Sequence, residues 1–156
     1  MTEGESANAR PERVPLASPV EVAPPPGFRQ QELHDPFEAH MGPLFEREDA
    51  NGDRIGAFIA DERHLRADGS VHEAMMMTFA DAFLGGAAWR GAGEKPCVTM
   101  SLQASFLADL KRGDVVEIRT KLEKRTRSVI FVSASFTVGD ETVMTATSLW
   151  KVLGAR

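Results

Sequence analysis

One long predicted helix constrains this chain more than any other feature. Residues 70 to about 89 read SVHEAMMMTFADAFLGGAAW, with apolar side chains at helical spacing on nearly every side. Ser70 and Glu73 fit the capping box S-x-x-E at its start, whereas Gly85 and Gly86 weaken its end. A helix that is apolar on nearly all sides must be enclosed, so the rest of the chain has to form a sheet that curves around it.

The flanking segments supply the strands. Asn51-Gly52 predicts a tight turn between two strands, because this pair tolerates the positive φ angles of hairpin turns. A short helix interrupted near Asp35-Pro36 is expected within 28–40. The predicted strands are 43–48, 55–65, 98–106, 114–124, 128–138 and 142–153, and short connections predict that the last four form an antiparallel meander.

This order predicts an α+β hotdog fold, an antiparallel curved sheet of about six strands wrapped around one long central helix. Residues 1–27 are rich in proline and lack apolar periodicity, which predicts a flexible tail before a domain at 28–156. Such a sheet leaves an exposed edge, so we expect a homodimer or a dimer of dimers.

Composition excludes several classes of protein. The net charge of −5 lacks the basic character that nucleic-acid binding requires. Cys97 is the single cysteine, which excludes an internal disulfide and a multi-cysteine metal site. Its neighbours favour a structural thiol, with a nucleophile as the other interpretation. The sequence has no apolar run long enough to span a membrane and no secretion-signal pattern, so a cytoplasmic location without membrane contact is expected.

Asp81 is the most unusual residue of the predicted helix. It lies within MMMTFADAFL, where an unpaired ionised carboxylate would be costly to bury. One interpretation is a narrow polar edge on which Asp81 is solvated or paired. The other is a half-buried carboxylate beside a ligand pocket, whose raised pKa suits a general base or nucleophile.

His72 lies at the first turn of the predicted helix, where a lone histidine is more often structural than catalytic. Ser70, His72 and Asp81 cannot form a triad in one chain, because the helix places His72 and Asp81 about 13 Å apart on opposite faces. The backbone N–H groups near Glu73 and Ala74 lack helical partners and can stabilise an oxyanion. They could act together with Asp81 only across two subunits.

Several short motifs have a familiar order and spacing. Gly69 precedes His72 by three residues, and Asp81 follows His72 by nine. Val-Thr-Met-Ser-Leu at 98–102 and Gly113-Asp114 follow downstream. Together these residues resemble the PaaI-like hotdog-fold acyl-CoA thioesterases, whose pattern is Asn-x-x-Gly-x-x-His-Gly-Gly with a catalytic Asp nine residues after the His. The resemblance covers roughly residues 40–153.

The resemblance implies a role for each position. Asp81 would be the base or nucleophile that delivers water to the thioester carbon, and the amide of Glu73 from the neighbouring subunit would face the thioester oxygen. His72 would shape that end of the site. Thr99 would position water near the carboxylate, although it also fits an ordinary strand threonine. The substrate-binding positions implied here are Gly69, Arg66 and Ala74.

Two departures from the family pattern affect the predicted site. Arg66 replaces the usual Asn, and Glu73-Ala74 replaces Gly-Gly. A Glu73 carboxylate pointing into the oxyanion site would oppose the negative charge that develops there. Two alternatives avoid this: Glu73 folds back to the Ser70 backbone N–H, or it pairs with Arg66.

The sequence therefore predicts an acyl-CoA thioesterase that needs no cofactor besides the coenzyme A of its substrate. The alternative is a hotdog protein that binds acyl-CoA without hydrolysing it. Met76 is a candidate for the wall of the acyl pocket, although core packing also explains the methionines around it. Arg125 and Arg127 are candidates for the coenzyme A phosphates, with a solvated basic turn as the other interpretation.

Overall fold

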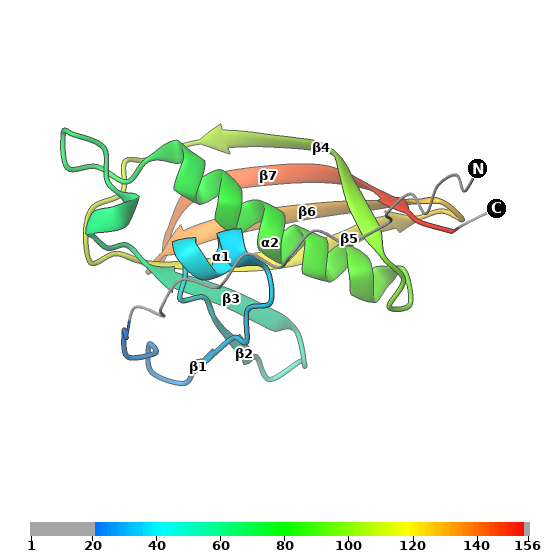
Figure 1. Cartoon of the computed structure of the whole chain (residues 1–156), viewed down its shortest axis with the longest axis horizontal. Coiled ribbons are helices and arrows are strands. Elements are labelled where there is room, and N and C mark those ends of the chain that lie inside the picture. The colour runs from blue at the N-terminus through cyan, green and yellow to red at the C-terminus, as the bar shows by residue number, and fades with distance from the viewer. Residues whose placement is uncertain (1–20, 155–156) are drawn as a thin grey trace, which may run out of the picture.

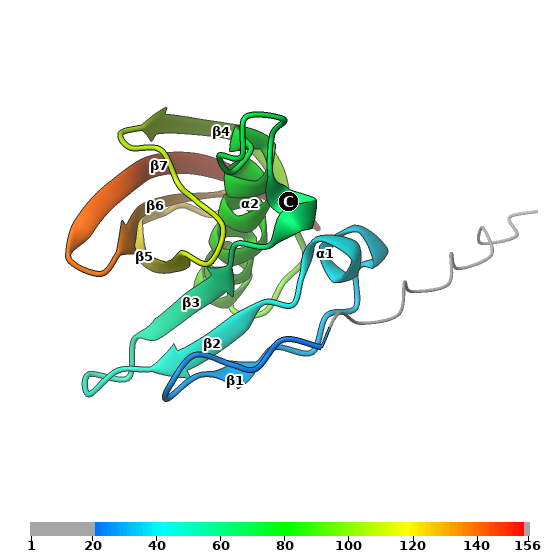
Figure 2. The same ribbon diagram turned by 90° about the vertical axis from the view of Figure 1, so that its left-hand side faces the viewer.

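A computed structural model describes residues 21–154 and shows an antiparallel sheet curved around one long helix (Figure 1, Figure 2). The helices are α1 (Pro36–Met41), the short 3-10 helix η1 (Glu62–His64) and α2 (Glu73–Gly91). The strands are β1 (Arg29–Gln30), β2 (Phe45–Glu48), β3 (Arg54–Ile59), β4 (Cys97–Phe106), β5 (Val115–Arg125), β6 (Val129–Val138) and β7 (Glu141–Val152). The predicted α+β hotdog class is confirmed.

Over the described residues 21–154, the sheet has seven strands in the order β1-β2-β3-β5-β6-β7-β4. The added strand is β1, a two-residue strand inside the segment predicted to be helical, and only 36–41 of that segment forms α1. Of the predicted tail, residues 1–20 lie outside the described residues, and residues 21–27 form no helix or strand. The flexibility of that tail therefore remains a prediction.

The predicted four-strand meander is wrong for its first strand. Strands β5, β6 and β7 follow one another in the sheet, but β4 pairs with β7 rather than with β5. The chain after β4 passes the start of α2, where Val71 N–H donates to Leu110 C=O, and then reaches β3, where Ala60 N–H donates to Asp114 C=O. The chain between β4 and β5 thus crosses the start of α2, and β5 lies on the opposite side of α2 from β4.

The sheet surrounds helix α2, as expected for a helix with apolar side chains on nearly all sides. The Phe79 ring, fully buried, makes edge-to-face contacts with Phe58 on β3, Phe83 on α2 and Phe136 on β6, at centroid distances of 4.8, 4.9 and 5.9 Å. Such pairs each add about 0.5–1.5 kcal/mol beyond the burial of their area. This aromatic cluster fixes α2 to both halves of the sheet.

Helix α2 approaches the sheet closely because two of the contact positions are glycines. A Cβ added at Gly56 on β3 would lie 2.2 Å from the Phe83 ring, and one at Gly85 would lie 2.9 Å from Trp150 on β7. Gly85, predicted only to weaken the helix, therefore has a packing role.

Helix α1 is fastened beside α2 by the chain that follows β3 (Figure 2). The predicted strand 55–65 ends at Ile59, and η1 follows it. The Arg63 guanidinium donates to the carbonyls of His40 and Gly42, and buried His64 lies 2.8 Å through Nε2 from the Met41 carbonyl oxygen. Because these carbonyls end α1, the helix is held firmly against the α2 face.

Candidate functional site

Asp81 lies in the middle of α2, on the side of the helix that a single chain leaves exposed. Its Oδ1 atom accepts a hydrogen bond of 2.9 Å from Thr99 Oγ1 on β4. The carboxylate is therefore fixed by one neighbour and keeps its other oxygen accessible. The half-burial considered for Asp81 does not occur in the single chain.

A β-bulge in β4 aims Thr99 at Asp81. Thr99 pairs with buried Trp150 of β7, whereas Ser101 pairs with Leu149, so Met100 is the extra residue. Side chains directly opposite one another share a face of an antiparallel pair, and Trp150 packs against α2. Thr99 therefore points towards α2, and the regular alternation predicted through β4 is wrong at this point because a bulge shifts the phase by one residue.

The start of α2 differs from the predicted capping box. His72, not Ser70, is the N-cap, and its Nδ1 accepts a hydrogen bond of 3.0 Å from Ala74 N–H. Met75 N–H donates to the His72 carbonyl. Within residues 21–154, the Glu73 N–H has no hydrogen-bond partner. The first amide of α2 is thus a free donor carrying the positive end of the helix dipole.

Arg66 holds the Glu73 side chain by an ion pair. Arg66 Nη1 lies 2.8 Å from Glu73 Oε1, while its Nε and Nη2 donate to Ser70 Oγ at 2.9 and 2.7 Å. The Ser70 N–H donates to Asp68 Oδ1, so it is not available to Glu73. Of the two alternatives for Glu73, the structure shows the pair with Arg66.

The two halves of the candidate site are well separated on one chain. Glu73 and Asp81 are eight residues apart, which places them about 12 Å apart along the helix axis. A group the size of a thioester cannot contact both. A site that used both groups would therefore need the Glu73 end of one α2 beside the Asp81 of another.

The other predicted site residues lie in different places. Gly69, with φ of 87°, forms the turn before α2, and Ala74 is exposed on its first turn. Met76 packs in the core at 3% exposure. Arg125 and Arg127 are exposed at the β5–β6 turn, near the end of α2 rather than its start, so the chain does not bring them to Glu73.

Glu38 on α1 is a neighbour of Asp81 that the sequence pattern did not predict. Burial raises the pKa of the Glu38 carboxyl above its ordinary value, and the negative charges of Asp35 and Asp81 raise it further. No spacing along the chain signals this proximity, because only the packing of α1 on α2 creates it. Among the described residues, no group of three His, Cys, Asp or Glu side chains is arranged to hold a metal ion.

A model of the thioesterase superfamily matches residues 68–145, half of the chain. The chain is also 31% identical over 127 residues to a Pseudomonas aeruginosa protein named "putative esterase", an alignment that covers 81% of this chain and 95% of the relative. The chain belongs to the thioesterase superfamily.

Solved structures share its fold. A mutant of the phenylacetic acid degradation protein PaaI from Thermus thermophilus matches with a TM-score of 0.65 and 23% identity, covering 76% of this chain and 100% of that chain. A Bacillus halodurans protein solved with CoA matches with a TM-score of 0.65 and 18% identity, covering 71% and 74%. At these identities the likeness establishes the fold. No helix within residues 21–154 has the length and hydropathy needed to cross a membrane.

Proposed function

We propose that this protein hydrolyses acyl-CoA thioesters to a free acid and CoA. Membership in the thioesterase superfamily supports the reaction class, and the related fold solved with CoA supports the substrate class. The observation that carries the proposal is the Asp81 carboxylate, exposed in the middle of α2 and oriented by Thr99 at 2.9 Å. An oriented carboxylate with one free oxygen suits a general base or a nucleophile.

In the general-base form, Asp81 takes a proton from water as the water oxygen attacks the thioester carbon. The carbonyl oxygen becomes an oxyanion, which accepts a hydrogen bond from the Glu73 N–H of the neighbouring subunit. Collapse of the intermediate breaks the carbon–sulfur bond, and the proton on Asp81 passes to the CoA thiolate. Thr99 holds the carboxylate throughout, and His72 keeps the Glu73 amide in place by capping the helix.

The Arg66–Glu73 pair fits this mechanism. A free Glu73 carboxylate beside its own amide would repel the developing oxyanion, but the guanidinium at 2.8 Å offsets that charge. Arg66 and Glu73 together thus replace the neutral residues of the family pattern. Gly69 and Ala74 shape this end of the site, with Met76 beneath it in the core.

The exposed edge of the sheet is the surface on which we place a second copy. Among the described strands β4 pairs only with β7, and its outward Val98 and Met100 are 47% and 56% exposed. Antiparallel pairing of two β4 strands about a two-fold axis would set two α2 helices antiparallel. The start of each α2 would then approach the middle of the other, and Arg125 and Arg127 would remain available for CoA phosphates.

A thiol-release assay over a panel of acyl-CoA esters tests the reaction. Asp81→Asn keeps the shape but cannot take a proton, so kcat should fall about 100- to 10,000-fold. Thr99→Val removes the hydrogen bond alone and should lower kcat about tenfold. Asp140→Asn, on the exposed β6–β7 turn, is the matched control and should leave kcat unchanged. Full activity in Asp81→Asn would refute the assignment.

The second candidate function is binding of acyl-CoA without hydrolysis. The presence of an acidic side chain at position 73, 45% exposed beside the proposed oxyanion donor, is the observation that favours it. Calorimetric titration with CoA esters separates the two functions. Binding with no thiol release by either the parent chain or Asp81→Asn would establish the binding protein.

A further inference from the structure

Residues 32–43 form a strap that leaves the sheet after β1, includes α1 and returns to the sheet at β2. The two ends of the strap are joined at the sheet, because Gln31 N–H donates to the Leu44 carbonyl oxygen at 2.8 Å. Strands β1 and β2 pair directly beyond this bond. The strap is therefore a closed excursion from the sheet, and it can open without separating β1 from β2.

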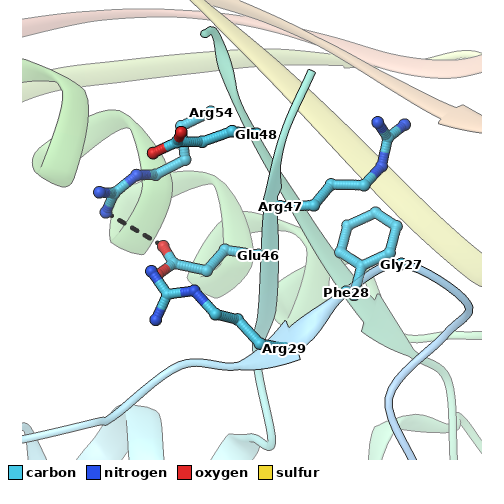
Figure 3. Close-up of a pocket in the computed structure, with 7 residues that line it drawn as sticks. All are labelled: Gly27, Phe28, Arg29, Glu46, Arg47, Glu48 and Arg54. Carbon is cyan, nitrogen blue, oxygen red and sulfur yellow. Dashed lines mark ion pairs between the residues drawn. The ribbon is translucent and has the colours of Figure 1, made fainter. Parts of the chain in front are cut away.

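The base of the strap is also fixed by charged side chains. Figure 3 shows Arg29 on β1 and Arg54 on β3 on either side of the Glu46 carboxylate of β2. Both guanidinium groups form ion pairs with Glu46, whose side chain is only 5% exposed. These pairs join three strands and include no residue of the strap itself.

Helix α1 is the part of the strap that lies beside α2 (Figure 2). It has six residues, and none of them is buried. Leu33 before the helix and Met41 at its end pack against the margin of the core, where both are only partly buried. Because opening of the strap exposes little additional apolar surface, apolar burial contributes little to keeping it closed.

Two adjacent side chains of η1 hold the end of α1. The Arg63 guanidinium donates to the carbonyl oxygens of His40 and Gly42, and His64 Nε2 lies 2.8 Å from the Met41 carbonyl oxygen. Three successive carbonyl groups that lack helical partners are thus bound by two residues. Within residues 21–154, these are the hydrogen bonds that join the strap to the rest of the molecule.

The surroundings of His64 suit only the neutral ring. Its Nδ1 accepts a hydrogen bond of 3.0 Å from the Asp61 N–H, so Nε2 carries the proton that is donated to Met41. On the other sides, Phe58 of β3 packs edge-to-face on the ring at 5.7 Å, and His72 contacts the His64 carbonyl through its backbone N–H. A second proton, at Nδ1, would face a donor and would charge a residue that is 2% exposed.

The charged groups that face the His64 ring among the described residues are Asp61 and Arg63. The Asp61 carboxylate lies 3.8 Å from Nδ1, but it is already bound by Arg63 through Nε and Nη2. Helix α1 presents only the Met41 carbonyl to the ring. Burial lowers the pKa of His64, although the Met41 carbonyl and Asp61 oppose this effect.

We infer that the strap is a pH-sensitive cover of α2, which opens when His64 is protonated while β1 and β2 stay in place. The charged ring loses its bond from Asp61, and opening of the strap admits the water that solvates the charge. Water enters from the α1 side, because Phe58 on the β3 side belongs to the buried core. The open strap exposes the surface of α2 on which α1 packs.

The sign of the pH dependence follows from the lowered pKa of His64. In the open strap the ring binds a proton with the ordinary pKa of 6.5, and in the closed strap only at lower pH. The equilibrium constant for opening should therefore rise about tenfold for each unit that the pH falls from 6.5 to the lowered pKa, and then stay level. Glu38 acts in the opposite direction, because burial raises its pKa above 4.5 and its protonation favours the closed strap.

Amide hydrogen exchange of the full chain, followed by NMR, tests the opening. Ala39 N–H donates to the Asp35 carbonyl and Gly42 N–H to the Glu38 carbonyl, so these two amides report on α1. Their protection factors, which correct for the intrinsic effect of pH on exchange, should fall about tenfold per unit below pH 6.5. Low concentrations of urea should leave them unchanged, because a local opening exposes little surface, whereas amides of β6 should lose protection.

Three variants identify the group that controls the strap. His64→Gln keeps a donor for Met41 but does not titrate, so the fall in α1 protection below pH 6.5 should disappear. Arg63→Gln removes the contacts with His40 and Gly42 and should lower α1 protection at every pH, with the same dependence on pH. His34→Gln, at an exposed position of the strap, is the matched control and should behave as the parent.

Two results would overturn the inference. If urea lowers the protection of Ala39 and Gly42 as steeply as that of β6, α1 opens only when the whole molecule unfolds. If His64→Gln keeps the pH dependence of the parent, another group controls the strap. The measurement involves no thioester, so its result stands whether or not the chain hydrolyses acyl-CoA.

Discussion

At the scale of single residues, the start of α2 shows how two unusual side chains compensate each other. The Glu73 carboxylate places a negative charge beside the Glu73 backbone N–H, which the proposed mechanism uses as a donor. Arg66 Nη1 pairs with that carboxylate at 2.8 Å. Arg66 also holds Ser70, so it links the turn before α2 to its first residue. The effect on activity of substituting either residue should therefore depend on whether the other is present.

Double-mutant kinetics measure that dependence. Arg66→Ala leaves the Glu73 charge unopposed and should lower kcat/KM about tenfold or more, because the oxyanion is then repelled. The double variant Arg66→Asn with Glu73→Gly removes both charges and should be more active than Arg66→Ala alone. Additive losses in thiol release would contradict the coupling.

His64 is the buried titratable residue that fastens α1 beside α2. Its Nδ1 accepts from the Asp61 N–H at 3.0 Å, and its Nε2 lies 2.8 Å from the Met41 carbonyl oxygen, which requires the neutral ring protonated at Nε2. Burial lowers the pKa of His64 below 6.5. Below pH 6.5 the unfolded chain takes up a proton that the folded chain does not, so stability falls as pH falls.

Urea unfolding at several pH values tests this dependence. The His64 contribution to the free energy of unfolding should be complete above pH 6.5 and be lost as the pH falls through the lowered pKa of His64. His64→Gln should flatten that dependence in a direct comparison with the parent. His34→Gln, at an exposed position, serves as the control. An unchanged slope in His64→Gln would contradict the assignment.

At the scale of elements, adjacent glycines in α2 have opposite roles. A Cβ at Gly85 would lie 2.9 Å from the Trp150 ring, which is held in place because its Nε1 donates to buried Ser148. A Cβ at Gly86 would meet only the flexible end of Arg90, at 3.4 Å. Helix propensity alone predicts the same effect of alanine at both positions, so any difference in stability must come from packing.

Alanine substitution at each position distinguishes the contribution of helix propensity to stability from that of packing. Gly85→Ala should destabilise the fold by about 1–3 kcal/mol, the usual cost of overpacking. Gly86→Ala should be neutral or stabilise it by up to about 1 kcal/mol. Chemical denaturation of both variants measures the difference, and equal effects would show that the approach of α2 to Trp150 is not limiting.

At the scale of the whole molecule, the proposed site depends on assembly. One chain places the Glu73 amide and Asp81 about 12 Å apart. Within residues 21–154, the β4 edge has backbone groups without a partner strand, together with outward apolar side chains. An exposed edge of this kind favours pairing with another strand.

A charged side chain introduced on the β4 edge should therefore weaken the association of two copies of the chain. Val98→Lys is expected to weaken self-association and to lower thiol release in proportion to the dimer lost. Leu122→Lys is the matched control, since Leu122 is equally exposed, 47%, on β5. Sedimentation velocity at several concentrations measures assembly, and Asp81→Asn should assemble normally. Full activity of a monomeric Val98→Lys variant would rule out the shared site.

Residue patterns along the chain were enough to predict the α+β class, the position of the long helix and the prominence of Asp81. These follow from periodicity and from the cost of burying a charge, both of which are local properties of the chain. The departures at Arg66 and Glu73 were also visible, because family spacing defines the positions they occupy.

Contacts between distant segments determine which residues meet. They made His72 the N-cap, selected the Arg66–Glu73 pair and placed β4 beside β7. A single extra residue, Met100, turned Thr99 towards α2, which strict alternation cannot predict. The arginines around Glu46 and the approach of Glu38 to Asp81 likewise depend on contacts between distant segments, whose geometry is fixed only when the whole core packs.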